Sequence, residues 1–120
     1  MSYCIVQRVD DELIQQHLQE LRRGTVVLAS LLSLRQPGYG YGLLESLSEA
    51  GIAVDGNTLY PLLRRLEKHG LLTSEWNTEE ARPRKFYRTS DDGDRLADIL
   101  VTAWHDIDTA LSRFTTGGTP

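Results

Sequence analysis

Cysteine is almost absent from this 120-residue chain, which carries it only once, at Cys4. A single cysteine excludes an intrachain disulfide and any Cys-x-x-Cys metal site. No apolar run comes near the roughly 20 residues that a membrane-spanning helix needs. The first ten residues lack a basic stretch followed by an apolar one, so the sequence predicts no secretion signal. We therefore expect a cytoplasmic protein with no membrane partner.

Catalytic constellations are also lacking, so we expect no enzyme and no cofactor. The run Gly38–Gly42 alternates glycine and tyrosine, but it has neither the Gly-Lys-Ser/Thr ending nor the Gly-x-Gly-x-x-Gly spacing of phosphate-binding loops. Cys4 has no evident partner base. His105 and Asp108 are three residues apart on an expected helix, and two ligands without a third do not make a metal site. We expect no catalytic residue and no bound metal.

Charged side chains are distributed unevenly around the net charge of −4. Residues 1–55 carry four basic and seven acidic side chains, and residues 91–120 carry two basic and six acidic ones. Residues 56–90 carry seven basic and four acidic side chains. This basic centre indicates either a surface that attracts phosphates or an ordinary solvated face.

Apolar spacing predicts three helices in the first half of the chain. The first covers about 11–22 and is interrupted at Gly24. Thr25 can then cap a second helix over about 26–35, whose apolar run predicts a central place in the core. A third helix is expected over about 41–50.

A fourth helix is predicted over 57–70, and its two faces differ. Its buried face carries leucines, namely Leu59, Leu62, Leu63 and Leu66. Its opposite face carries Asn57, Pro61, Arg64 and Lys68. Proline fits a helix start, where no backbone amide bond is lost, so we favour a helix that begins near Asn57 over one that begins at Asp55.

Two short strands are expected at 72–77 and 85–89, joined by a polar loop over 78–84. Ser90 then caps a last helix over about 91–114. The fold class is therefore mainly α with a small β-hairpin. Three helices and a hairpin are the parts of a winged helix-turn-helix, with the hairpin as the wing.

This order divides the chain into three parts. Residues 1–90 would form the winged helix-turn-helix DNA-binding domain, including the N-terminal helix, and 91–114 would form a C-terminal dimerisation helix. Residues 115–120 are expected to be a disordered tail.

If 57–70 is a recognition helix, each of its exposed side chains has a task. Asn57 can pair with N6 and N7 of adenine, and Thr58 can touch a thymine methyl group or a phosphate. Arg64 can bind guanine or phosphate, while Arg65 and Lys68 are better placed for the DNA backbone.

Other expected DNA contacts have equally simple structural alternatives. Tyr60 can reach a phosphate with its hydroxyl group, or it is a half-buried core tyrosine. The wing residues Arg82, Arg84 and Lys85 can enter a narrow minor groove or hold phosphates. Alternatively, they form a charged loop that keeps the hairpin from aggregating.

The last helix carries a wide apolar stripe that predicts a two-fold homodimer. The stripe consists of Leu96, Ile99, Leu100, Ala103, Ile107, Ala110, Leu111 and Phe114. Its spacing alternates between three and four residues, as in paired helices. Ile14 and Leu18 of the first helix would pack against the partner's last helix. The alternative is that the stripe docks on its own domain.

Trp104 lies at the margin of this stripe, one turn from Leu100. Two copies across the dimer axis could stack a small planar, apolar effector, with Asp108 or Asp106 selecting a cationic one. The alternative is that Trp104 fills the core of the interface.

Four segments of the chain resemble the PadR family of bacterial regulators. They are Leu21-Arg-Arg-Gly-Thr-Val-Val-Leu, Tyr39-Gly-Tyr-Gly-Leu-Leu, Asn57-Thr-Leu-Tyr-Pro-Leu-Leu-Arg-Arg-Leu-Glu-Lys-His-Gly-Leu-Leu72 and Arg84-Lys-Phe-Tyr-Arg-Thr-Ser-Asp-Asp-Gly93. The resemblance runs in order over about 21–93 and, with one C-terminal helix, is to the shorter subfamily. It implies a dimeric winged helix that represses by binding double-stranded operator DNA and is released by a small molecule.

A dimer implies two half-sites and hence a near-palindromic operator. The alternative function is a winged-helix adaptor that binds another protein through the same surface. Such an adaptor would be expected to expose apolar or acidic residues along 57–70, where this chain has polar and basic ones.

Overall fold

The computed structural model describes residues 10–79 and 81–115. In chain order the elements are α2 (Asp11–Ser33), β1 (Gly38–Tyr39), α3 (Gly40–Glu49), α4 (Gly56–Lys68), β2 (Leu72–Asn77), β3 (Arg84–Thr89) and α5 (Asp91–Thr115). The prediction of a mainly helical fold with a small sheet is confirmed. Of the expected tail at 115–120, only Thr115, which ends α5, lies within the described residues.

The first two expected helices are one continuous helix, so the predicted break at Gly24 is wrong. Asp10 caps this helix, α2, by accepting a hydrogen bond from the amide of Leu13 at 2.8 Å. Gly24 has open space where a side chain would stand. Thr25 does not cap a new helix, because its hydroxyl donates to the carbonyl of Arg22 at 2.6 Å within α2.

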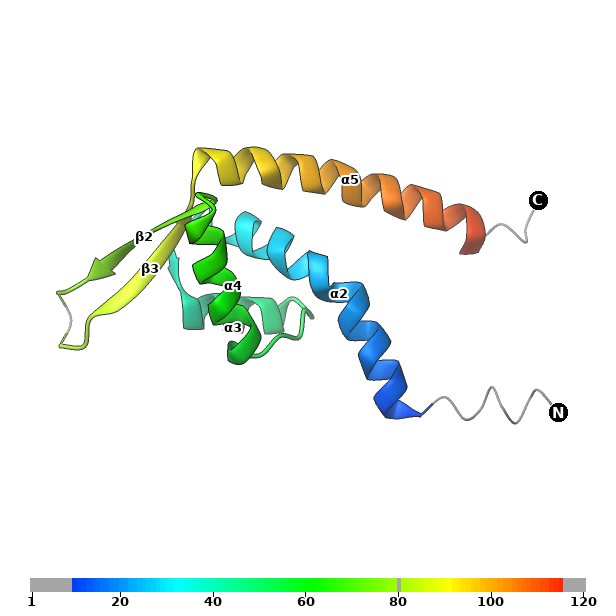
Figure 1. Cartoon of the computed structure of the whole chain (residues 1–120), viewed down its shortest axis with the longest axis horizontal. Helices are drawn as coiled ribbons and strands as arrows, with labels where there is room; N and C mark the ends of the chain where they lie inside the picture. Colours follow the sequence, from blue (N-terminus) through cyan, green and yellow to red (C-terminus); the bar gives the residue numbers. More distant parts are fainter. Residues whose placement is uncertain (1–9, 80, 116–120) are drawn as a thin grey trace.

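The wing is part of a three-stranded antiparallel sheet of order β1-β3-β2. The short first strand, β1, was not predicted. It lies within the glycine-tyrosine run and pairs Gly38 with Tyr87 and Tyr39 with Phe86. The strand prediction at 72–77 is confirmed, and β3 begins one residue earlier than expected, at Arg84. The hairpin of β2 and β3 projects from the helices at one end of the molecule (Figure 1).

Helix α4 begins one residue before the expected start, and the reasoning about Pro61 is wrong. Asp55 is the N-cap and accepts a hydrogen bond from the amide of Thr58 at 2.9 Å. Pro61 therefore lies inside the helix, past its first turn. It stands on the exposed side, where water can solvate the carbonyl that lacks its helical amide partner.

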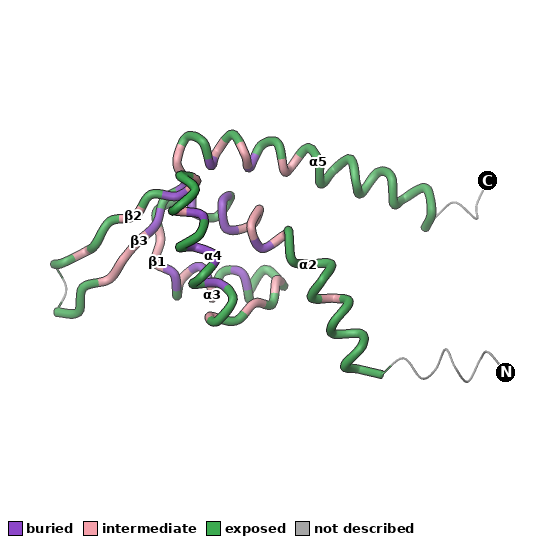
Figure 2. The backbone as a smooth tube through the Cα atoms, in the orientation of Figure 1, coloured by how far each residue is buried: buried purple, intermediate pink, exposed green. Residues whose placement is uncertain are grey.

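The core gathers where α3, α4, the sheet and the second half of α2 meet (Figure 2). All four leucines predicted for the buried face of α4 are in it, with exposed fractions from 0% to 6%. Leu31 and Leu34 of the α2 end and Leu72 of β2 are also almost fully buried. The leucine face thus fixes which side of α4 turns outward.

Helix α5 is anchored to the core only through its first turns. Ser90 caps it, accepting a hydrogen bond from the amide of Gly93 at 3.0 Å, as predicted. Gly93 and Ala97 are buried, and a side chain at Gly93 would stand 2.1 Å from the carbonyl oxygen of Leu71. Arg35 adds ion pairs to Asp94 and Asp98, each at 2.9 Å.

The rest of α5 and the first half of α2 extend away from the wing and diverge toward the two termini (Figures 1 and 2). Both carry large apolar side chains that are exposed, namely Leu13, Ile14, Leu21, Ile99, Trp104, Ile107, Leu111 and Phe114. Among the described residues, no helix is long and apolar enough to cross a membrane.

Candidate nucleic-acid interface

The outward face of α4 is polar and basic. Its exposed side chains include Asn57, Thr58, Arg64, Arg65 and Lys68. Within residues 10–79 and 81–115, none of these five side chains makes a hydrogen bond or an ion pair. Their donors are therefore available to an external ligand.

Tyr60 is wedged between the starts of α3 and α4. Side chains built at Gly40 and Gly56 would lie 2.6 Å and 2.9 Å from atoms of its ring. The tyrosine is nevertheless 36% exposed, and its hydroxyl has no hydrogen-bond partner among the described residues. The ring therefore sets how closely α3 approaches α4, as in the half-buried alternative, while the hydroxyl stays accessible.

An ion pair connects the wing to α4. The ammonium group of Lys85 in β3 lies 3.0 Å from Oε1 of Glu67 in α4. The other carboxylate oxygen of Glu67 accepts a hydrogen bond from the hydroxyl of Ser74 in β2. The bond from Ser74 and the ion pair with Lys85 lower the pKa of Glu67. The same carboxylate raises the pKa of Lys85.

Two tyrosines contact the opposite face of the wing, at the end of its strands next to the loop. The rings of Tyr39 and Tyr41 stack with centroids 5.7 Å apart. Arg84 of β3 donates to the hydroxyl of Tyr41 at 2.6 Å, and its guanidinium lies 5.1 Å from the centre of that ring. Asn77 of β2 donates to the hydroxyl of Tyr39 at 2.8 Å. These contacts connect both wing strands to the β1–α3 junction.

The three wing residues expected to bind DNA differ in whether the protein itself engages their side chains. Arg82 is exposed in the loop, and no hydrogen bond or ion pair is found for it within the described residues. Arg84 and Lys85 are half-buried and engaged within the protein. Sequence reasoning missed their partners Tyr41 and Glu67, because it treated the glycine-tyrosine run as a turn and searched α4 for cations.

The residues expected at a dimer interface fall into two groups. Leu96 and Leu100 pack against the chain's own core, as the docking alternative predicts for this part of α5. From Thr102 onward every residue of α5 is exposed, including Ala103, Ala110 and Asp108. Leu18 of α2 is half-buried and Ile14 is 39% exposed.

Trp104 is 47% exposed, and its indole meets the ring of His105 edge-on at 5.0 Å. The described residues contain no group of three or more His, Cys, Asp or Glu side chains that could hold a metal ion.

Known proteins resemble this chain in sequence and in fold. Residues 27–98 match the Transcriptional regulator PadR-like family. The crystal structure of a PadR family transcriptional regulator from Eggerthella lenta DSM 2243 is 45% identical, with a TM-score of 0.82 over 88% of this chain and 94% of that one. A PadR-like regulator from Bacillus cereus, 24% identical, shares the fold with a TM-score of 0.73 over 80% of this chain and 96% of that one.

A curated relative is the transcriptional regulator Rv3488 of Mycobacterium tuberculosis, which is 44% identical over 55 residues. That match covers 46% of this chain and about half, 51%, of the relative. The family match covers more than half of the chain, and the Eggerthella lenta structure matches nearly all of it. The chain belongs to the PadR-like family of transcriptional regulators.

Proposed function

We propose that this regulator binds operator DNA sequence-specifically by placing α4 in the major groove. The observation that carries the proposal is the free polar face of α4 opposite its buried leucines. Asn57, near the helix N-terminus, would read a base edge, and Arg64 would read guanine or hold a phosphate. Arg65 and Lys68 would hold the DNA backbone.

The wing would contribute mainly through Arg82, whose side chain has no partner in the described protein. Arg84 and Lys85 remain within reach of the same surface, but their contacts with Tyr41 and Glu67 favour a positioning role. Tyr60 would combine both tasks, with its ring packed on glycines and its hydroxyl available to a phosphate.

The DNA-binding form would be a two-fold homodimer. Exposed apolar residues line the distal part of α5 and the first half of α2, and the described residues of one protomer cover neither of them. Ile99, Ile107 and Phe114, each more than half exposed, would pack against the second copy. Such burial would remove a large apolar surface from water. The two-fold symmetry of the dimer would place the two α4 helices on successive turns of a near-palindromic operator.

We further propose that the regulator represses transcription and that a small planar effector releases it. Trp104 supports this proposal, because about half of the residue is exposed beside the proposed interface. A ligand stacked there, with Leu100 beneath and Asp108 able to select a cation, would alter how the two α5 helices pack and hence the spacing of the α4 helices.

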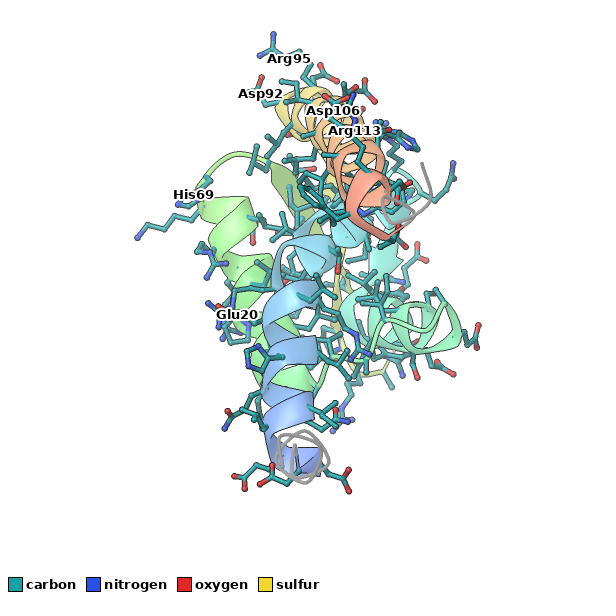
Figure 3. The ribbon with its side chains drawn as sticks, turned by 90° about the vertical axis from the view of Figure 1, so that its right-hand side faces the viewer. Glu20, His69, Asp92, Arg95, Asp106 and Arg113 are labelled. Carbon is teal, nitrogen blue, oxygen red and sulfur yellow. The ribbon has the colours of Figure 1, made fainter. Side chains whose placement is uncertain are left out.

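A mobility shift with DNA from directly upstream of the chain's own gene tests the proposal. The wild-type protein should retard this fragment at concentrations that leave unrelated DNA free. Arg64→Gln should weaken binding and lower the slope of log affinity against log salt by about one unit. Arg95→Gln is the matched control, since Arg95 pairs with Asp92 on the outer side of α5 (Figure 3). Equal binding by all three proteins would place the DNA surface elsewhere, and a wild-type protein that retards no DNA would favour the adaptor function.

A further inference from the structure

A groove runs between the first half of α2 and the side of α4. Its volume is about 800 Å³, within the range of roughly 300–1,000 Å³ found for small-molecule sites. Gln15, Gln19 and Arg22 line it from α2, and Thr58, Leu62 and Arg65 line it from α4. Each set recurs every three or four residues, so each forms a stripe on one helix face. The two helix faces are thus the walls of the groove.

The side chains that line this groove carry a net positive charge. Three arginines and one aspartate line it. Arg23 is paired with Glu20 at 2.9 Å, and Asp55 accepts the capping hydrogen bond of α4. Arg22 and Arg65 have no hydrogen-bond or ion-pair partner for their side chains among the described residues. Two guanidinium groups on facing helices therefore remain available to an anion.

The inner part of the groove is apolar. Val26 and Leu62 reach it from α2 and α4 and are 7% and 6% exposed. Val54, in the segment before α4, is half-buried and completes this surface. A ligand that fits would combine an anionic group with a hydrocarbon or aromatic body.

We propose that this groove binds a small amphipathic anion. Arg22 and Arg65 hold its carboxylate, phosphate or sulfonate group, because guanidinium groups bind such oxyanions through paired hydrogen bonds. Val26, Val54 and Leu62 contact its apolar body. The site lies within one protomer and is separate from the surface around Trp104.

This site couples to DNA binding, a consequence that rests on the proposed function. Thr58 and Arg65 belong both to the groove and to the DNA surface of α4. An anion held by Arg65 withdraws that side chain from the DNA backbone and places negative charge beside the phosphates. Ligand and operator therefore compete.

Dye titrations of the full chain test the anion site directly. The probe is 8-anilinonaphthalene-1-sulfonate, and its uncharged counterpart is N-phenyl-1-naphthylamine, which shares the fused rings. Arg22→Gln should weaken sulfonate binding about tenfold or more, since a charge-assisted hydrogen bond is lost, and should leave the uncharged dye unaffected. Arg95→Gln should leave both unchanged. If Arg22→Gln does not alter sulfonate affinity while its circular dichroism is unchanged, the proposal is wrong.

Competition with the upstream DNA fragment separates the two proposals. The sulfonate dye should weaken DNA binding by the wild type, and Arg22→Gln should remove this effect. A protein that binds the dye through Arg22 but binds no DNA would refute the proposed function and leave the anion site standing. If Arg22→Gln alone lowers DNA affinity and the salt slope by about one unit, the groove holds a DNA phosphate, and the small-anion site is refuted.

Discussion

The ammonium group of Lys85 and the carboxylate of Glu67 lie 3.0 Å apart, which joins the second strand of the wing to α4. Both side chains are about one-third exposed. Their free-energy contribution to folding is therefore expected to stay below about 1 kcal/mol. The main consequence of the pair is geometric, because it fixes the angle between the two proposed DNA-contacting elements.

Glu67→Gln should therefore weaken operator binding several-fold while lowering the free energy of unfolding only slightly. Glutamine keeps one acceptor oxygen but has no charge, so the ion pair with Lys85 is lost and the contact between the wing and α4 is weakened. Anisotropy titrations with labelled DNA and urea denaturation would measure the two effects. Glu75→Gln is the control, since Glu75 is exposed on β2 with no side-chain partner among the described residues. A loss of affinity equal to that of the control would show that the wing angle does not depend on this pair.

The same pair predicts a dependence of stability on pH. The pKa of Glu67 is lowered from its ordinary value of 4.5, so its stabilisation is present above that pH and is lost as the pH falls through the folded-state value. The pKa of Lys85 is raised from 10.5, so its contribution is present below that pH and disappears as the pH rises through the folded-state value. The difference in unfolding free energy between wild type and Glu67→Gln should therefore shrink at both extremes. A constant difference from pH 3 to pH 7 would contradict the acid part of this prediction.

Two glycine-to-alanine substitutions should have opposite effects on stability. At Gly93 the new Cβ would stand 2.1 Å from the carbonyl oxygen of Leu71, so α5 must shift away from the core. We expect a loss of at least about 1–3 kcal/mol. At Gly24 nothing lies within 4 Å, and alanine favours the helix by about 1 kcal/mol. Thermal and urea unfolding would measure both, and a Gly93→Ala variant as stable as wild type would show that α5 is not seated as described.

Local sequence signals predicted the elements where packing and propensity agree. The leucine stripe of α4, the Ser90 cap and the strand at 72–77 are of this kind. The break at Gly24 failed because one glycine costs a helix only about 1 kcal/mol, which the burial of the following turns outweighs. A capping threonine and a mid-helix threonine also look alike in sequence.

Long-range contacts could not be predicted in the same way. Strand β1 has only two residues, and its pairing partner lies nearly fifty positions further on, so no local period reveals it. The partners of Arg84 and Lys85 likewise depend on how the sheet meets α3 and α4. Sequence identified the cations of the wing, and only the structure separated Arg82 from the two engaged residues.

The proposed dimer predicts that a charge in the exposed stripe of α5 produces monomers. Ile107→Glu should shift the sedimentation profile from dimer to monomer at micromolar concentration, because a carboxylate would be buried without a partner. Thr109→Glu is the matched control, since it adds the same charge on the opposite side of the helix. Helical circular dichroism should stay unchanged in both, because Ile107 is 56% exposed in the protomer. Wild-type protein that sediments as a monomer at this concentration would refute the dimer.

Trp104 provides the test of the proposed effector. Trp104 is 47% exposed, and the other tryptophan, Trp76 in β2, is 63% exposed, so Trp76→Phe is needed to remove the second signal. In that variant, planar aromatic compounds, among them cationic ones, should quench the remaining fluorescence and weaken operator binding over the same concentration range. The two effects coincide because one ligand would both cover the indole and change the packing of the α5 helices. Trp104→Ala should still bind DNA but no longer respond to these compounds. Quenching without any change in DNA affinity would mean that the indole is merely accessible, and the absence of quenching would favour a tryptophan that only fills the interface.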